Sequence, residues 1–166
     1  MLTNFDLEDI CDSYGIKINK ICMKDDLPAR LTDGNYIINL QSSKLGNGTH
    51  WLALCIKANQ CMFFDSFGAP PSIEIREFVK KRKGSHLAYN NWIIQDLKSE
   101  NCGYFCVSFL LHIQKHFKQD LYKAANDYIN KFQDDTSKND NILRDTFREM
   151  TKKGIPLLIK RLYNQN

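Results

Sequence analysis

Apolar and polar residues alternate along the first part of the chain in a pattern that predicts one helix followed by several strands. The opening helix spans 5–14, begins after an N-cap at Asn4 and ends at Gly15. Strands are predicted at 35–41 and 90–95, and a pair at 50–57 and 60–64 is joined by a turn at 58–59. Both strands of the pair are apolar on both faces, so we expect them to be central in a sheet that is covered on each side. The apolar side of the opening helix consists of Phe5, Leu7, Ile10 and Cys11.

Two further helices and a helical tail follow. One helix is predicted at 72–83, ended by Gly84, and a second, longer and more apolar, at 102–117. The segment 119–166 is predicted to be a polar helical tail, with capping signals at Asp120, Asp135 and Asn139. Within an arc of about 140°, the long helix presents Cys102, Phe105, Cys106, Phe109, Leu110, Ile113 and Phe117.

Composition places the chain among ordinary globular proteins. Its 166 residues, 43% hydrophobic and 25% charged, predict one domain over 1–166 and exclude collagen, coiled coils and long disordered tails. Apolar runs are too short to span a membrane, and the acidic N-terminus does not resemble a signal peptide. Six cysteines without an export signal indicate free thiols in a reducing compartment. The net charge of +4 is too small to predict nucleic-acid binding.

Cys102 stands where a polar loop becomes the first turn of the long helix. Unpaired backbone N–H groups and the positive end of the helix dipole stabilise a thiolate at such a position. Gly103, the next residue, would let a substrate backbone come close. The alternative interpretation is a small, buried and inert cysteine at a helix start.

His50 and Asp65 lie at the open end of the predicted hairpin. With the turn at 58–59, the numbers of paired residues sum to 117, so Leu52 faces Asp65 and His50 lies diagonal to it. Diagonal neighbours are about 7–8 Å apart, within reach of a hydrogen bond if the strand ends curl together. A nucleophilic thiol needs an imidazole and a group that orients it, which these residues could supply. Asp65 alone is equally typical of a turn that ends a strand.

Gln95 precedes Cys102 by seven residues and is predicted at the end of the strand 90–95. Its side-chain amide could lie beside the backbone N–H of Cys102 and form an oxyanion hole.

The long helix also carries residues of metal-binding types on one face: Cys102, Cys106, His112 and His116. Fourteen residues at about 1.5 Å rise separate its ends by about 21 Å, whereas zinc ligands lie about 2.0–2.3 Å from the ion. We therefore expect no metal site, interpret the two histidines as a polar stripe beside the apolar face, and assign Cys106 to core packing.

A basic run consists of Lys80, Lys81, Arg82 and Lys83. It could contact phosphates, or it could complement the C-terminal dipole of the helix at 72–83. The second interpretation is the simpler one.

Three blocks resemble the active-site segments of the adenovirus-type maturation cysteine proteases, within the superfamily that includes the SUMO-deconjugating enzymes. The blocks are Thr-His-Trp-Leu-Ala-Leu at 49–54, Cys-Met-Phe-Phe-Asp-Ser-Phe-Gly at 61–68, and Gln95 followed after six residues by Cys-Gly-Tyr-Phe-Cys. The resemblance covers residues 1–117 and leans toward the adenoviral branch, with relatives in virophages and Maverick/Polinton elements.

The resemblance implies an α+β, circularly permuted papain-like cysteine protease fold. In that fold a mixed central sheet is flanked by helices, and Cys102 begins the central helix. It implies His50 as general base, Asp65 as its orienter and Gln95 as oxyanion donor. It also implies a narrow groove suited to glycine, with Trp51 near its wall, although Trp51 could equally be a core aromatic. In adenoviral enzymes a peptide activator forms a disulfide at the position of Gly84 here, so this chain departs from that pattern.

These observations predict a viral maturation endopeptidase that cleaves capsid or core precursors at Gly-containing sites. We expect a monomer that needs no cofactor, with DNA as a conceivable activator through the basic run. The expected location is the host cytoplasm or viral factory and the virion interior, without secretion or membrane attachment. The alternatives are an isopeptidase for ubiquitin or a SUMO-like modifier, and a catalytically silent module that binds nucleic acid.

Overall fold

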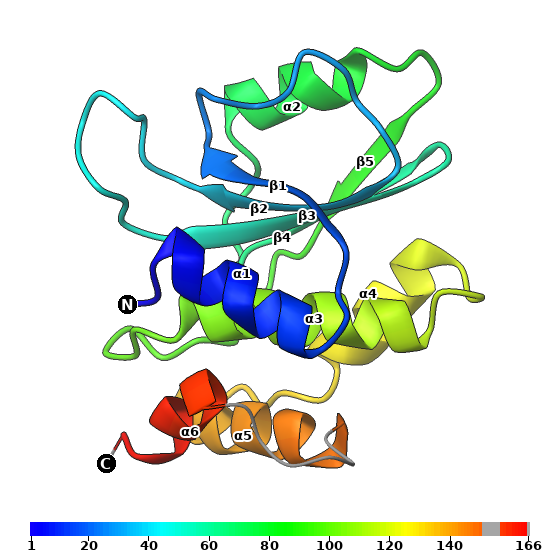
Figure 1. The fold of residues 1–166 in the computed structure, drawn as a ribbon. Helices are drawn as coiled ribbons and strands as arrows, with labels where there is room; N and C mark the ends of the chain where they lie inside the picture. The colour runs from blue at the N-terminus through cyan, green and yellow to red at the C-terminus, as the bar shows by residue number, and fades with distance from the viewer. Residues whose placement is uncertain (151–156, 166) are drawn as a thin grey trace.

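The computed structural model describes residues 1–150 and 157–165. In these residues a five-stranded mixed sheet has the order β1-β2-β3-β4-β5, with the outer pairs parallel and the two inner pairs antiparallel (Figure 1). The strands are β1 (Ile18–Met23), β2 (Gly34–Asn39), β3 (Trp51–Lys57), β4 (Gln60–Phe64) and β5 (His86–Tyr89). The helices are α1 (Asn4–Ser13), α2 (Ile73–Lys80), α3 (Cys102–Lys115), α4 (Leu121–Ile129), α5 (Asn139–Met150) and α6 (Leu157–Tyr163), with a 3₁₀ turn at Thr136–Lys138.

Helices cover both faces of the sheet, so the central strands are apolar on both sides. On one face α2 packs through Ile75, Phe78 and Val79. On the other face lie α1 and α3, and α5 and α6 form a further layer on the side of α3 away from the sheet (Figure 1). The helix α3 is therefore surrounded, and every residue from Cys102 to Ile113 is buried.

The hairpin has the predicted register. Ile56 pairs with Cys61 and Ala53 with Phe64, and Ala58 in the turn has a φ of 54°, in the left-handed region. This register directs His50, which immediately precedes β3, toward the residues that follow β4.

Several predicted boundaries are wrong. The N-cap of α1 is Thr3, not Asn4, because Thr3 and Asp6 form a capping box. Phe5 does not share the buried side of α1 with Leu7, Ile10 and Cys11, since 70% of it is exposed. The strand β1 was not predicted, because its polar and apolar residues alternate weakly at the sheet edge. Phe117 lies just beyond the end of α3 and is 62% exposed.

The segment 90–95 is not a strand; the last strand is β5, at 86–89. The Asn90 side chain binds the backbone N–H and carbonyl of Asp65, and the N–H groups of Ile94 and Gln95 both donate to the Ser66 carbonyl. The hydrogen bonds of this segment are therefore made within a loop and not to a neighbouring strand. Trp92 and Ile93 are about half exposed.

The predicted polar tail also has an apolar side. Asp120 caps α4, Asp135 caps the 3₁₀ turn and α5 begins at Asn139, as the capping signals indicated. Tyr128 and Phe147 are fully buried in the core that α3 shares with the sheet. The tail residues that the structure describes therefore complete the hydrophobic core.

Candidate active site

Cys102 is the first residue of α3 and is 3% exposed. The backbone N–H of Trp51 donates to its Sγ at 3.5 Å, which ties the start of α3 to the start of β3. As the first helical residue, Cys102 has a backbone N–H without a partner within the helix. The sulfur therefore lies beside N–H groups that favour negative charge.

His50 lies between Asp65 and Cys102. Its Nε2 is 2.6 Å from Oδ1 of Asp65, so Nδ1 is the nitrogen left for Cys102. The imidazole stacks on Phe67, with ring centres 4.8 Å apart. Burial acts to lower the pKa of His50, but hydrogen bonds and charge from Asp65 and Cys102 outweigh it and raise the pKa to about 9. These contacts therefore favour the protonated form of His50.

The turn after β4 holds the Asp65 carboxylate. Its oxygens accept the backbone N–H groups of Phe67, at 2.9 Å, and Ala69, at 3.2 Å. Gly68 makes this turn possible, since its φ is 69° and an added Cβ would lie 2.8–2.9 Å from the backbone of Trp92. The Asp-Ser-Phe-Gly sequence is thus both the turn and the support of the carboxylate.

Gln95 is buried in the loop before α3, not at the end of a strand. Its Oε1 accepts from Oγ of Ser66 at 2.6 Å, and its Nε2 donates to the carbonyl of Ser99 at 2.6 Å. These two bonds determine which end of the amide is the donor, and they leave the second Nε2 hydrogen available to another acceptor.

Trp51 and Gly103 are both buried. For Gly103, the surroundings argue against the predicted contact with a substrate backbone. A Cβ on Gly103 would lie 3.1 Å from the Leu2 side chain and 3.3 Å from those of Leu7 and Trp51. The missing side chain therefore serves internal packing instead of the substrate approach that the sequence suggested. The Trp51 indole donates to the Leu2 carbonyl at 2.8 Å, and Trp51 also lines a cleft of about 750 Å³. Both interpretations of Trp51 thus describe part of its surroundings.

Solved structures provide a comparison for this arrangement. The chain is similar to AvrA delL154 with IP6 and CoA, with a TM-score of 0.54 and 12% identity over 96% of this chain and 66% of that one. It also aligns with the ASFV pS273R protease, with a TM-score of 0.49 and 15% identity over 75% of this chain and 61% of that one. The chain therefore shares the overall fold of AvrA.

The likeness concerns the fold, and the chain spans about two thirds or less of the length of both proteins. No model of a known protein family matches the sequence, and no curated protein matches it. Any function must therefore be argued from the site itself.

The basic run is mostly occupied by contacts within the protein. Lys80 pairs with Glu77, Lys81 donates to the carbonyls of Pro28 and Ala29, and Arg82 pairs with Asp33. Among the residues described, no cluster of three or more His, Cys, Asp or Glu side chains could hold a metal ion. No helix in the same residues is long and apolar enough to cross a membrane.

His112 is buried, contrary to the predicted polar stripe. It is 2% exposed and packs beside His116 and Tyr128, with ring centres 4.2 and 5.5 Å away. Neither ring nitrogen has a well-formed hydrogen bond to any described residue. Burial, with the positive charges of Lys131 and His116, lowers the pKa of His112 to about 4.

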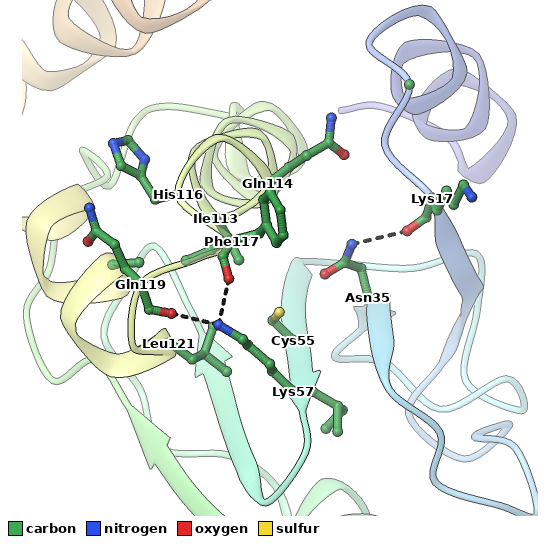
Figure 2. A pocket seen from close by; sticks show the side chains of 13 residues that line it. Lys17, Asn35, Cys55, Lys57, Ile113, Gln114, His116, Phe117, Gln119 and Leu121 are labelled. Carbon is green, nitrogen blue, oxygen red and sulfur yellow. Dashed lines mark hydrogen bonds between the residues drawn. The ribbon is translucent and has the colours of Figure 1, made fainter.

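A second pocket, of about 470 Å³, lies at the opposite end of α3 from Cys102 (Figure 2). Cys55, Ile113 and Leu121 form part of its apolar lining. Lys57 also lines the pocket, and its ammonium group donates to the carbonyls of Phe117 and Gln119 (Figure 2). Lys57 thus holds the segment that directly follows α3.

Sequence reasoning missed the residues that support the site. Ser66, Asn90, Ser99 and Asp140 bond to the loops that carry Asp65, Gln95 and Cys102. Each is a common polar residue in a segment without a motif, so no signal in a single sequence identifies it.

Proposed function

We propose that this chain is a cysteine endopeptidase in which Cys102 is the nucleophile, His50 the general acid and base, and Asp65 the residue that orients His50. The observation that carries the proposal is the buried His50, bonded through one nitrogen to Asp65 and interacting with Cys102 at the first turn of α3. Asp65 and Cys102 stabilise the imidazolium, which supports a thiolate–imidazolium pair as the resting state.

The proposed reaction proceeds through a thioester. The Cys102 thiolate attacks the carbonyl carbon of the scissile peptide, and the carbonyl oxygen becomes an oxyanion. The Cys102 backbone N–H and the second Nε2 hydrogen of Gln95 would donate to it. The His50 imidazolium then gives its proton to the leaving amine as the C–N bond breaks. Neutral His50 next takes a proton from water, which attacks the thioester and releases the acid and the thiolate.

The proposed substrates are viral capsid or core precursors, cleaved at Gly-containing sites. The proposed scaffold of the enzyme itself is a circularly permuted papain-like fold. The cleft beside Trp51 is the proposed binding site for the acyl side of the substrate. It runs between the first residues of the chain and the loop 40–49. The preference for glycine near the cut is proposed from the resemblance. DNA as an activator remains a proposal, with Lys83 the member of the basic run to vary first.

Thiol labelling and cleavage together test the proposal. Wild type and Cys102→Ala would be treated with trace iodoacetamide at about pH 6, and the labelled cysteine mapped by mass spectrometry. Burial raises the pKa of the other five thiols, which serve as internal controls. We expect fast labelling at Cys102 alone, and peptide cleavage that is lost in a Cys102→Ala protein with unchanged thermal unfolding. Cleavage by that variant would refute the mechanism.

The choice of substrate separates the proposed function from its alternatives. A Gly-containing peptide library and a ubiquitin-like modifier fused through its C-terminal Gly-Gly would be offered to the same samples, with and without DNA. Cleavage of the fusion alone would identify an isopeptidase. Steeply salt-dependent DNA binding without selective labelling of Cys102 would identify a nucleic-acid-binding module.

A further inference from the structure

The tail reaches back to the short segment between Gln95 and Cys102. Asp140, in the first turn of α5, accepts hydrogen bonds from Nδ2 of Asn101, at 2.9 Å, and from Oγ of Ser99, at 3.1 Å. Asn101 is the N-cap of α3 and directly precedes Cys102. One carboxylate therefore holds two residues of the segment from a helix about 40 positions later in the chain.

Ser99 passes this restraint on to Gln95. Its carbonyl accepts Nε2 of Gln95 at 2.6 Å, and its Oγ accepts the backbone N–H of Asn101 at 3.3 Å. The amide of Gln95 is held at its other end by Ser66. The direction of the remaining Nε2 hydrogen thus depends on where Ser99 lies, and Asp140 fixes that position.

The start of α5 is itself rigidly placed. Asn139 is fully buried, and its Nδ2 donates to the carbonyls of Ile94 and Gln133 at 2.9 and 2.8 Å. One turn further, Leu143 is also fully buried in the core around α3. Asp140 therefore acts from a fixed platform and not from a mobile tail.

We propose that Asp140 is a positioning residue for the reaction, acting through Ser99 to aim the Gln95 amide at the oxyanion. This inference rests on the proposed function. Asp140 does not contact the reacting atoms. His50, Asp65 and the sulfur of Cys102 are held by separate bonds that do not involve α5.

The separation of these two sets of bonds gives a specific test. Peptide cleavage forms an oxyanion, whereas alkylation of Cys102 by iodoacetamide does not. For Asp140→Ala we expect kcat to fall by about tenfold to a hundredfold with KM little changed, because a misaligned donor loses most of its effect. The rate of Cys102 alkylation and its pH profile should stay within about threefold of wild type. Asp140→Asn retains one acceptor oxygen and should recover part of the loss.

Matched variants control for effects on folding. Asp145→Ala removes an exposed carboxylate of the same helix, paired with Arg148, and should leave both rates unchanged. If Asp140→Ala does not fold, Ser99→Ala removes one of the same bonds and should show the same pattern to a smaller degree. Wild-type kcat in a folded Asp140→Ala, or equal losses of cleavage and alkylation, would overturn the inference. Failure of the proposed function would differ, since wild type would then show no cleavage that depends on Cys102.

Discussion

The buried His112 should make the stability of this protein unusually sensitive to mild acid. In the unfolded chain a histidine titrates near pH 6.5, whereas in the folded protein the pKa of His112 is lowered to about 4. Between these values the unfolded chain binds one more proton than the folded protein. The free energy of unfolding therefore falls as the pH drops from about 6.5 to about 4.

The size of this effect follows from the gap between the two pKa values. At about 1.4 kcal/mol for each pH unit, the gap from 6.5 to about 4 gives about 3.5 kcal/mol in full, and about 2.5 kcal/mol is reached by about pH 4.5. That is a large share of the 5–15 kcal/mol by which domains are typically stable. The charged groups that act on His112 are Lys131 and His116, which oppose its protonation, and Asp127, which favours it.

The perturbation that isolates His112 is His112→Leu, which keeps the apolar contacts with Tyr128 and leaves Lys131, His116 and Asp127 in place. Urea unfolding of both proteins would be followed by tryptophan fluorescence from about pH 7.5 to pH 4.5. We expect the variant to be at least as stable at neutral pH, because an unpaired polar ring is replaced by an apolar one. Wild type should then lose about 2.5 kcal/mol more than the variant on acidification. Parallel curves, within about 0.5 kcal/mol, would refute the reasoning.

Two further predictions concern the turn and the ion pair of the site. Gly68→Ala should lower the free energy of unfolding by about 1–3 kcal/mol more than Gly15→Ala does, as measured by urea titration. Both glycines have a φ near 65–69°, but only a Cβ at Gly68 would meet the backbone of Trp92. Asp65→Asn should lower the pKa of His50 from about 9, measured by NMR titration. The stability that Asp65 confers through His50 is complete below about pH 6.5 and lost as the pH rises through about 9. The difference in stability between wild type and Asp65→Asn should therefore shrink in alkaline solution, to the part that the bonds with Phe67 and Ala69 contribute.

The sequence was most informative where local chemistry decides the structure. The hairpin register followed from one turn, and this register was enough to predict that His50 and Asp65 come together. The place of Cys102 beside them was implied by the resemblance and not by the register. The strand predicted at 90–95 failed because the Asn90 side chain takes the backbone groups of Asp65, a bond across 25 positions. Local patterns carry no information on such partners.

The same limit explains the tail. Its caps were visible because a cap is a local feature, but its contacts were not. Tyr128 and Phe147 pack against α3, and Asp140 bonds to Asn101 across 39 positions. A helix whose apolar face is narrow looks polar in sequence, although that face completes the core.

The contact between Asp140 and the segment before Cys102 has a consequence for biosynthesis. A domain generally folds as a unit, and Tyr128, Leu143 and Phe147 of the tail belong to the core around α3. The segment that carries Gln95 and Cys102 therefore reaches its fixed position only after α5 has been synthesised and Asp140 is present. The proteolytic activity would then begin only once synthesis has passed this helix.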